Sequence, residues 1–447
     1  MEAIHEKSHL DTHLPELVGL WSVPPTQTDI IKTYHQRVNV KGDLDNSNEI
    51  IFESGAEKDF IDLSESYIEI EIKVVCTAGS IIADDNLALT NLFAHGLFES
   101  IRLTDKSGRP LSNLNEQRYP YQAMLLTLLS KNYNWSKTAG QIEGFYADTP
   151  GQFDTSGAAN TGFTARQALI TATARDQPAP SVTVVLRPFI GIMKSKRLLL
   201  SDMNLRLSLT RSKPEFYLQS AAAVPGARAQ ITKAHWYLKR VQLTPAAENF
   251  NIEQISKERA LYPIDRTLFY QQQEVNKTQF RMTDMWSGPL PSHLFLAIVR
   301  SSAFEGNITQ NPYNFANFNL NSLQLTAGSL KVPENEFKPV FNGTNITNTS
   351  IAREYMGLLE VAGKAWGNDG NLIDIKNYVG GCAIYAFDLT ADGSQGAHWS
   401  LAHRSELSIT GSFANAPAHP ITIIAIGMIP SVIEVGMDRS VITDFTE

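Results

Sequence analysis

The chain has 447 residues and a mass of 49.5 kDa; 43% of the residues are apolar and 19% are charged. These proportions exclude a disordered or coiled-coil chain, and the length favours two or three domains. Because the net charge is −8, direct sequence-specific binding of nucleic acid is not expected.

Residues 1–30 are predicted to form an N-terminal arm, a plausible strap beneath a larger assembly or to a partner protein. The arm has no basic start followed by an apolar stretch, so we expect no signal peptide. The longest apolar run, 421–430, has half the length of a membrane span, so no span is expected. The arm also cannot neutralise a genome, because it carries Glu2, Glu6, Asp11 and Glu16 against Lys7 alone.

The arm contains HEKSH at 5–9, which fits the zinc pattern HExxH, and His13 continues the spacing. A zinc site of this kind needs a buried helix and a third ligand held by a core. A polar terminal segment offers neither, so a flexible arm is favoured over a metal site.

Apolar and polar residues alternate at every second position through most of the chain, which predicts strands with one wet face. In 67–75, isoleucine and valine occupy one face while glutamate and lysine occupy the other. Short runs of this kind between Gly, Pro, Asn and Asp are typical of an antiparallel sandwich. Further strands are predicted at 182–187, 205–210, 236–243, 323–326, 383–389, 407–410 and 421–426.

Helices are predicted in only two places, 113–133 and 245–260. The segments 134–180 and 301–380 are long and polar, so we expect them to be functional loops on a rigid scaffold.

Four short segments of the first half resemble four of the second half in the same order, which indicates an internal repeat. We therefore predict two tandem sandwiches of about 200 residues each, joined near 245–260. The matched segments are 100–104 with 322–326, 182–189 with 382–389, 207–212 with 407–412, and 235–241 with 421–427.

No catalytic, cofactor-binding or metal-binding residue is predicted. Cys76 and Cys382 cannot form a disulfide framework and have no CxxC neighbour, which favours a reducing compartment. Other chemical signals are weak: the histidines lack close pairing, the phosphate-loop-like segment has the wrong spacing, and the acid pairs fit solvated faces. These are His398, His403 and His419, the segment 357–364, and the pairs Asp84–Asp85 and Glu69–Glu71.

Two further groups of residues suggest exposed surfaces. Six N-x-S/T sequons are interpreted as unmodified surface sites, and six loop aromatics are candidate contacts between chains, although packing within the chain is equally plausible for each aromatic. The sequons are Asn134, Asn276, Asn307, Asn342, Asn345 and Asn348; the aromatics are Tyr133, Trp135, Phe145, Tyr146, Phe315 and Phe318.

Several blocks resemble, in order, the major capsid proteins of Polinton/Maverick elements and their adintovirus relatives. In the first half these include FIDLSESYIEIEIKV (60–74) and RYPYQAMLLTLLS (118–130). The resemblance covers about 30–445, but 134–180 and 342–350 follow no family pattern. The other blocks are 91–104, 196–218, 261–270, 288–325, 385–392 and 434–445.

This resemblance implies an all-β chain of two tandem eight-stranded jelly rolls, with a few short helices in connecting loops. The expected divisions are the arm 1–30, a first roll 31–250, a second roll 251–436 and a tail 437–447. The implied function is a non-enzymatic major capsid protein. It would form pseudo-hexameric homotrimers that tile an icosahedral shell around double-stranded DNA.

The resemblance also implies penton and minor or cement proteins as partners, synthesis in the host cytoplasm and a final place in the virion. Two other functions remain open on sequence grounds: a double jelly-roll enzyme that acts on glycans or uses copper, and a lectin-like attachment protein.

Overall fold

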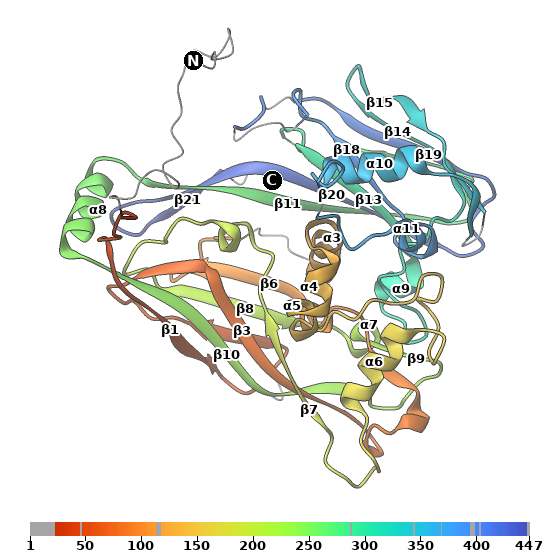
Figure 1. Ribbon diagram of the computed structural model, residues 1–447, viewed down its shortest axis with the longest axis horizontal. Coiled ribbons are helices and arrows are strands. Elements are labelled where there is room, and N and C mark those ends of the chain that lie inside the picture. The colour runs from red at the N-terminus through yellow and green to blue at the C-terminus, as the bar shows by residue number, and fades with distance from the viewer. Residues whose placement is uncertain are drawn as a thin grey trace, which may run out of the picture.

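Antiparallel strands form two sandwiches that lie one above the other in Figure 1. The expected all-β fold of tandem jelly rolls is confirmed. None of the described helices is long and apolar enough to cross a membrane. The computed structural model describes residues 23–44, 47–112, 118–286, 288–342, 345–367, 369–393, 398–401 and 404–444.

The first sandwich has two layers that share strand β1 (Ile30–Lys41). This strand pairs with β10 along most of its length, and its last residues pair with β2, so it passes from one layer to the other. One layer has the order β7-β3-β10-β1, and the other continues as β2-β8-β6. The bounds are β2 Glu49–Glu53, β3 Phe60–Cys76, β4 Gly79–Ser80, β6 Phe98–Asp105, β7 Ser181–Leu186, β8 Leu205–Arg211 and β10 Arg228–Leu243; β5 Leu87–Leu89 pairs separately with β9 Leu218–Ser220.

The second sandwich repeats this plan as two separate layers, β11-β20-β13-β18 and β12-β19-β14-β15. A short strand, β21, extends the first of these layers beside β20. The bounds are β11 Ala260–Glu274, β12 Gln279–Thr283, β13 His293–Arg300, β14 Leu320–Ala327, β15 Leu330–Phe337, β18 Ile384–Asp388, β19 Leu407–Phe413, β20 Ile421–Val435 and β21 Val441–Thr443; β16 Val340–Asn342 and β17 Asn345–Ser350 form a hairpin.

The two sandwiches match strand for strand, as the sequence repeat predicts. The matched segments lie on β6 and β14, β7 and β18, β8 and β19, and β10 and β20, and each pair holds the same place in its sheet. One difference is the counterpart of β15: in the first sandwich the described residues place only a single bridge, Thr104 to Pro110, beside β6.

Helix α3 (Tyr119–Ser130) lies between the two sandwiches (Figure 1). Every residue from Tyr119 to Leu129 is buried, as expected for a helix that is covered on all sides. One continuous core cluster contains α3, the interior of the first sandwich and one face of the β20 sheet. The halves therefore share a core, and the second sandwich has an additional core of its own.

The two expected helices are present as α3 and α8 (Pro245–Lys257), and α8 connects the sandwiches. The long segments only partly match the expectation of loops. Residues 134–180 contain three short helices, with irregular chain at 143–160 and 171–180, and 301–380 contain β14, β15 and further helices. The expected tail is also partly sheet, because β21 pairs with β20. The other helices are η1 Ala83–Asp85, α2 Phe93–Gly96, α4 Tyr133–Lys137, α5 Ala139–Ile142, α6 Thr161–Ile170, η2 Gly191–Lys194, α7 Pro214–Tyr217, α9 Ser301–Glu305, α10 Ala352–Val361 and α11 Ile375–Gly380.

Candidate functional site

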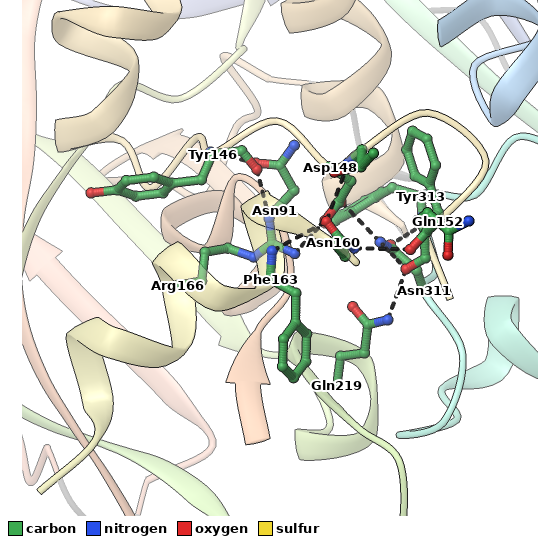
Figure 2. A network of polar contacts seen from close by, with 12 residues as sticks. Asn91, Tyr146, Asp148, Gln152, Asn160, Phe163, Arg166, Gln219, Asn311 and Tyr313 are labelled. Atoms are coloured by element: carbon green, nitrogen blue, oxygen red, sulfur yellow. Dashed lines mark hydrogen bonds and ion pairs between the residues drawn. The ribbon is translucent and has the colours of Figure 1, made fainter. Parts of the chain in front are cut away.

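A network of buried polar side chains lies where the two halves meet (Figure 2). We call Asp148, Asn160, Arg166 and Asn311 the junction network. At its centre, Nη2 of Arg166 lies 2.6 Å from Oδ1 of Asp148, and neither side chain has exposed surface. A charge pair removed from water is tolerated only when further hydrogen bonds satisfy both partners.

Arg166 meets that condition because its guanidinium also donates to two backbone carbonyls. Nε donates to the carbonyl of Leu89 at 2.6 Å, and Nη1 donates to the carbonyl of Tyr146 at 2.6 Å. Leu89 ends strand β5, whereas Arg166 lies on α6. The arginine therefore fixes this helix to the first sandwich.

Asn160 links Asp148 to the start of α6. Its Oδ1 accepts the backbone N–H of Phe163 at 3.3 Å, which is the N-cap bond that asparagine commonly makes. Its Nδ2 donates to Oδ1 of Asp148 at 2.9 Å. The same residue thus caps the helix and satisfies the buried carboxylate.

The second half joins the network through Asn311. Nδ2 of Asn311 donates to Oδ2 of Asp148 at 3.1 Å, and its backbone N–H donates to Oδ1 of Asp154 at 2.8 Å. Nearby, the backbone N–H of Gly151 donates to the carbonyl of Gly380 at 2.7 Å. The carboxylate of Asp148 accepts three bonds, all from protein, so this network joins the two halves rather than presenting a ligand site.

Aromatic side chains reinforce the same junction. The ring of Tyr121 on α3 stacks on Phe304 of α9 at 5.1 Å and meets Phe216, Tyr313 and Phe315 edge-on or tilted at 5.6, 5.9 and 6.4 Å. Burial raises the pKa of Tyr121 well above its usual value, so its hydroxyl stays neutral. The cluster therefore contributes apolar and aromatic contact between the halves.

A second cluster of buried polar side chains connects helices of the first half to one another. Tyr119 accepts the backbone N–H of Phe189 at 3.2 Å, and its oxygen lies 2.7 Å from Nδ1 of the buried His95. On the other side of the ring, Nε2 of His95 lies 3.3 Å from a carboxylate oxygen of Glu143. This chain of bonds joins α2, α3 and the residue after α5.

The six candidate aromatics differ in their exposure to solvent. Tyr133 is 66% exposed and stays available to another chain. Phe145 and Phe315 are buried, so for them the alternative of packing within the chain holds. Half-buried positions are taken by Trp135, Tyr146 and Phe318.

The candidate metal ligands do not form a site within the part of the chain that the structure describes, where no group of three or more His, Cys, Asp or Glu side chains could hold a metal. His398 instead lies 2.7 Å from Asp392 at an exposed position, and His419 is exposed. The HEKSH motif, His13 and His403 lie outside the described residues.

The acid pairs and the glycine segment also have structural explanations. Asp85 pairs with Arg175 at 2.6 Å, and Glu71 pairs with Lys233 at 2.8 Å. The hydrogen bond from Lys233 lowers the pKa of Glu71. Most of 357–364 lies in or directly after helix α10 instead of forming a phosphate-binding loop before a helix.

Sequence reasoning missed the exposed apolar residues of the second half. Trp366 is 85% exposed, Leu401 78% and Trp399 53%. Trp366 borders a groove of about 670 Å³ whose wall includes Phe337 and Arg353. In the sequence, Trp366 is followed by Gly, Asn and Asp, and a large apolar residue in such a polar segment could have indicated an exposed contact. Exposed side chains of this size are candidates for contact with another molecule.

The chain matches no protein-family profile and no curated protein sequence. Solved structures, by contrast, match over nearly its whole length. The Faustovirus major capsid protein superposes with a TM-score of 0.57 at 8% identity, covering 92% of each chain.

Two further capsid structures give the same result. The mavirus major capsid protein matches with a TM-score of 0.56 at 12% identity, covering 99% of this chain and 96% of its own. The PBCV-1 virus capsid protein matches at 0.55 and 10% identity, covering 96% of this chain and 100% of its own. The chain therefore has the double jelly-roll fold found in viral major capsid proteins.

Proposed function

We propose that this protein is a viral major capsid protein whose homotrimers, pseudo-hexameric in outline, tile an icosahedral shell around double-stranded DNA. The observation that carries the proposal is the pair of matching sandwiches joined by one core and the junction network. Three such rigid doubled units in a ring present six similar lobes, and a six-lobed ring can tile a closed shell.

We place the protein near the major capsid proteins of Polinton/Maverick elements and adintoviruses. Support for this finer placement comes from the ordered sequence blocks, such as 60–74 and 118–130. Penton and minor or cement proteins are the proposed partners. The protein would be synthesised in the host cytoplasm and reside in the virion.

The proposed work is association, with no enzymatic step. A permanent trimer needs interfaces that bury more than about 2,000 Å². Exposed apolar residues of the second half, Trp366, Trp399 and Leu401, are suitable contacts. The net charge of −8 fits a shell protein that makes no direct sequence-specific contact with nucleic acid.

Light scattering coupled to size exclusion tests the trimer directly. We expect a mass three times that of the 49.5 kDa chain, and negative-stain microscopy should show hexagonal particles or closed shells. A purified chain that stays monomeric at high concentration and forms no particles would contradict the proposal.

A variant pair tests the contacts. Trp366→Asp combined with Leu401→Asp should abolish the trimer while leaving the unfolding midpoint within the range of the parent protein, because both side chains are exposed. Gln273→Asp, at an exposed polar position of β11, is the matched control and should remain trimeric. Intact trimers from the double variant would place the contacts elsewhere.

A further inference from the structure

Helices α3 and α10 occupy equivalent places in the two sandwiches. Helix α3 lies between β6 and β7 in the chain, and α10 lies between β14 and β18, which are the matching strands of the second sandwich. In space, α3 contacts β6 and α10 contacts β18. The surroundings of the two helices can therefore be compared directly.

The two helices differ in what covers them. In Figure 1, β11 and β20 of the second sandwich run directly above α3, and Ile424 and Ile426 of β20 belong to the same core cluster as α3. Helix α10 buries Leu358, whereas Leu359 is half-buried and Glu360 is exposed. Within one chain, a sheet layer thus covers α3, while one side of α10 reaches solvent.

A groove of about 670 Å³ follows the exposed side of α10. Its apolar lining includes Phe337 of β15 and Trp366, which is 85% exposed. Arg353, also at the groove, donates to two backbone carbonyls of its own chain. Glu360 lines the groove as well, and among the described residues its carboxylate has no ion-pair partner. The groove therefore combines an apolar contact surface with an unpaired negative charge.

The layer of the first sandwich that matches the cover of α3 is β7-β3-β10-β1, and its outward face carries aromatic side chains. Strand register places Arg37, Tyr237 and Tyr67 in one row across β1, β10 and β3. The two tyrosine rings stack at 5.1 Å, and the ring of His35 lies 5.5 Å from that of Tyr67. We call these four residues the aromatic face. Tyrosine and arginine are enriched in protein interfaces.

The charges around the aromatic face are mostly paired or adjacent to a partner, but Arg37 is different. It is exposed and has no ion-pair partner in the part of the chain that the structure describes. Its positive charge is complementary to the negative charge of Glu360. The other charges are Glu71 with Lys233 at 2.8 Å, Asp62 with Lys239 at 3.3 Å, and Glu69 opposite His235.

We propose that the aromatic face of one chain covers α10 and its groove on a second copy, as the β11-β20 layer covers α3 within each chain. This contact rests on the homotrimer proposed for the protein. The two surfaces lie on different sides of the molecule, because α10 and β15 belong to the upper part of Figure 1 and β1 and β10 to the lower part. Such a contact is heterologous, and a closed ring of three chains occupies every copy of both surfaces.

The two covering layers differ in composition because they are covered at different stages. The β20 layer is covered as the chain folds, so Ile424 and Ile426 can be wholly apolar. The aromatic face reaches solvent until a second chain binds. Side chains that combine an apolar ring with a polar atom, such as Tyr67, Tyr237 and His35, suit both conditions.

Charge reversal tests which layer of the first sandwich meets the neighbouring chain. Arg37→Glu places a negative charge on the aromatic face, and trimers should then need at least about tenfold more protein to form. Arg102→Glu is the matched control, because Arg102 is exposed on β6 in the other layer, and it should leave assembly unchanged. Light scattering across a dilution series measures both variants.

Both arginines are exposed, so the unfolding midpoint of each variant should equal that of the parent protein. Trimers that are weakened by Arg102→Glu, or that tolerate Arg37→Glu, would overturn the proposed contact.

Cross-linking between two different chains tests the partner surface. In a Cys76→Ser background, a chain with Arg37→Cys and a tagged chain with Glu360→Cys are co-expressed, purified together and treated with a short bismaleimide. The matched control replaces Glu360→Cys with Val275→Cys, because Val275 is 56% exposed just beyond β11 and belongs to neither surface. Linkage between unlike chains should be at least about tenfold greater with Glu360→Cys than with Val275→Cys.

The results distinguish this contact from the trimer itself. A trimer in which Arg37→Cys links equally to both positions overturns the contact and leaves the proposed function standing. A chain that stays monomeric overturns both.

Discussion

Equivalent layers of the two sandwiches face different surroundings. On β3 and β10 of the first sandwich, the outward residues Glu71 and Lys233 reach solvent and pair with each other. On β20 of the second sandwich, Ile424 points into the shared core while its neighbour Ile423 points into the separate core of its own sandwich. The first layer is therefore buried on one face, whereas the equivalent layer of the second sandwich is buried on both faces along β13 and the first half of β20.

This difference explains the two sequence patterns. A sheet with one wet face alternates apolar and polar residues, as in 67–75, whereas a sheet buried on both faces reads as a continuous apolar run, as in 421–427. The second face is buried because α3 and the elements attached to it cover it (Figure 1). Burial beneath α3 and its neighbouring elements, rather than strand topology, therefore distinguishes the two layers.

The largest effect is expected from the junction network. Arg166→Met leaves the carboxylate of Asp148 buried without its ion pair, and we expect a loss of about 3 to 5 kcal/mol in the free energy of unfolding. Chemical denaturation measures it. Adding Asp148→Asn should restore part of the loss, because a neutral amide is less costly to bury. A loss below about 1 kcal/mol would show that the pair contributes little to the junction between the two halves.

One outward residue on each of β10 and β20 provides the direct comparison. Ile424→Ala should cost about 2 to 5 kcal/mol because it leaves a cavity in the shared core. Lys233→Ala should cost less than about 1 kcal/mol because it removes only a surface ion pair. If both variants lost a similar free energy of unfolding, this would contradict burial of β20 on both faces and of β10 on one.

Two carboxylates should respond to pH in opposite directions. Burial raises the pKa of Glu354 on α10 above its usual 4.5, so the folded chain binds that proton more tightly than the unfolded chain. Its contribution is complete below pH 4.5 and is lost as the pH rises through the raised pKa. Glu354→Gln should therefore be more stable than the parent at neutral pH, and the gap should close in acid.

Glu71 provides the contrast, because Lys233 lowers its pKa and its contribution is lost as the pH falls. Thermal unfolding of Glu71→Gln and Glu354→Gln across the acid range measures both signs. A Glu354→Gln advantage that grows in acid would refute the assignment.

The smallest effect concerns the two thiols. Cys382 is buried in the second half, and burial raises the pKa of its thiol, whereas Cys76 is half-buried at the end of β3. Iodoacetamide should therefore modify one cysteine in the folded protein and two after unfolding, as read by intact mass. Modification of Cys382 in the folded chain would show that the shared core opens.

The sequence was sufficient to predict what regular spacing encodes. Alternation located β3, and the four repeated segments predicted the matching strands of the two sandwiches. Strand β13 was missed because its residues, HLFLAIVR, are buried on both faces and show no alternation. Helix α3 was predicted, but its burial on all sides was not.

The junction network could not be predicted. Asp148 and Asn311 are 163 positions apart, and single polar residues in long polar segments carry no periodic signal. Only the fold brings them together. The sequence left the place of Phe315 open for a related reason: only the fold brings its ring against Tyr121.

The shared core has a consequence for synthesis. The strands of the first sandwich are complete once β10 has left the ribosome, but the aromatic ring of Tyr121 then has no Phe304 or Phe315 to cover it. A nascent chain at this stage exposes apolar surface that the second half later buries, and such exposure favours aggregation or binding by chaperones. We therefore expect a translational pause between α8 and α9 to lengthen the exposure of this apolar surface and to increase aggregation.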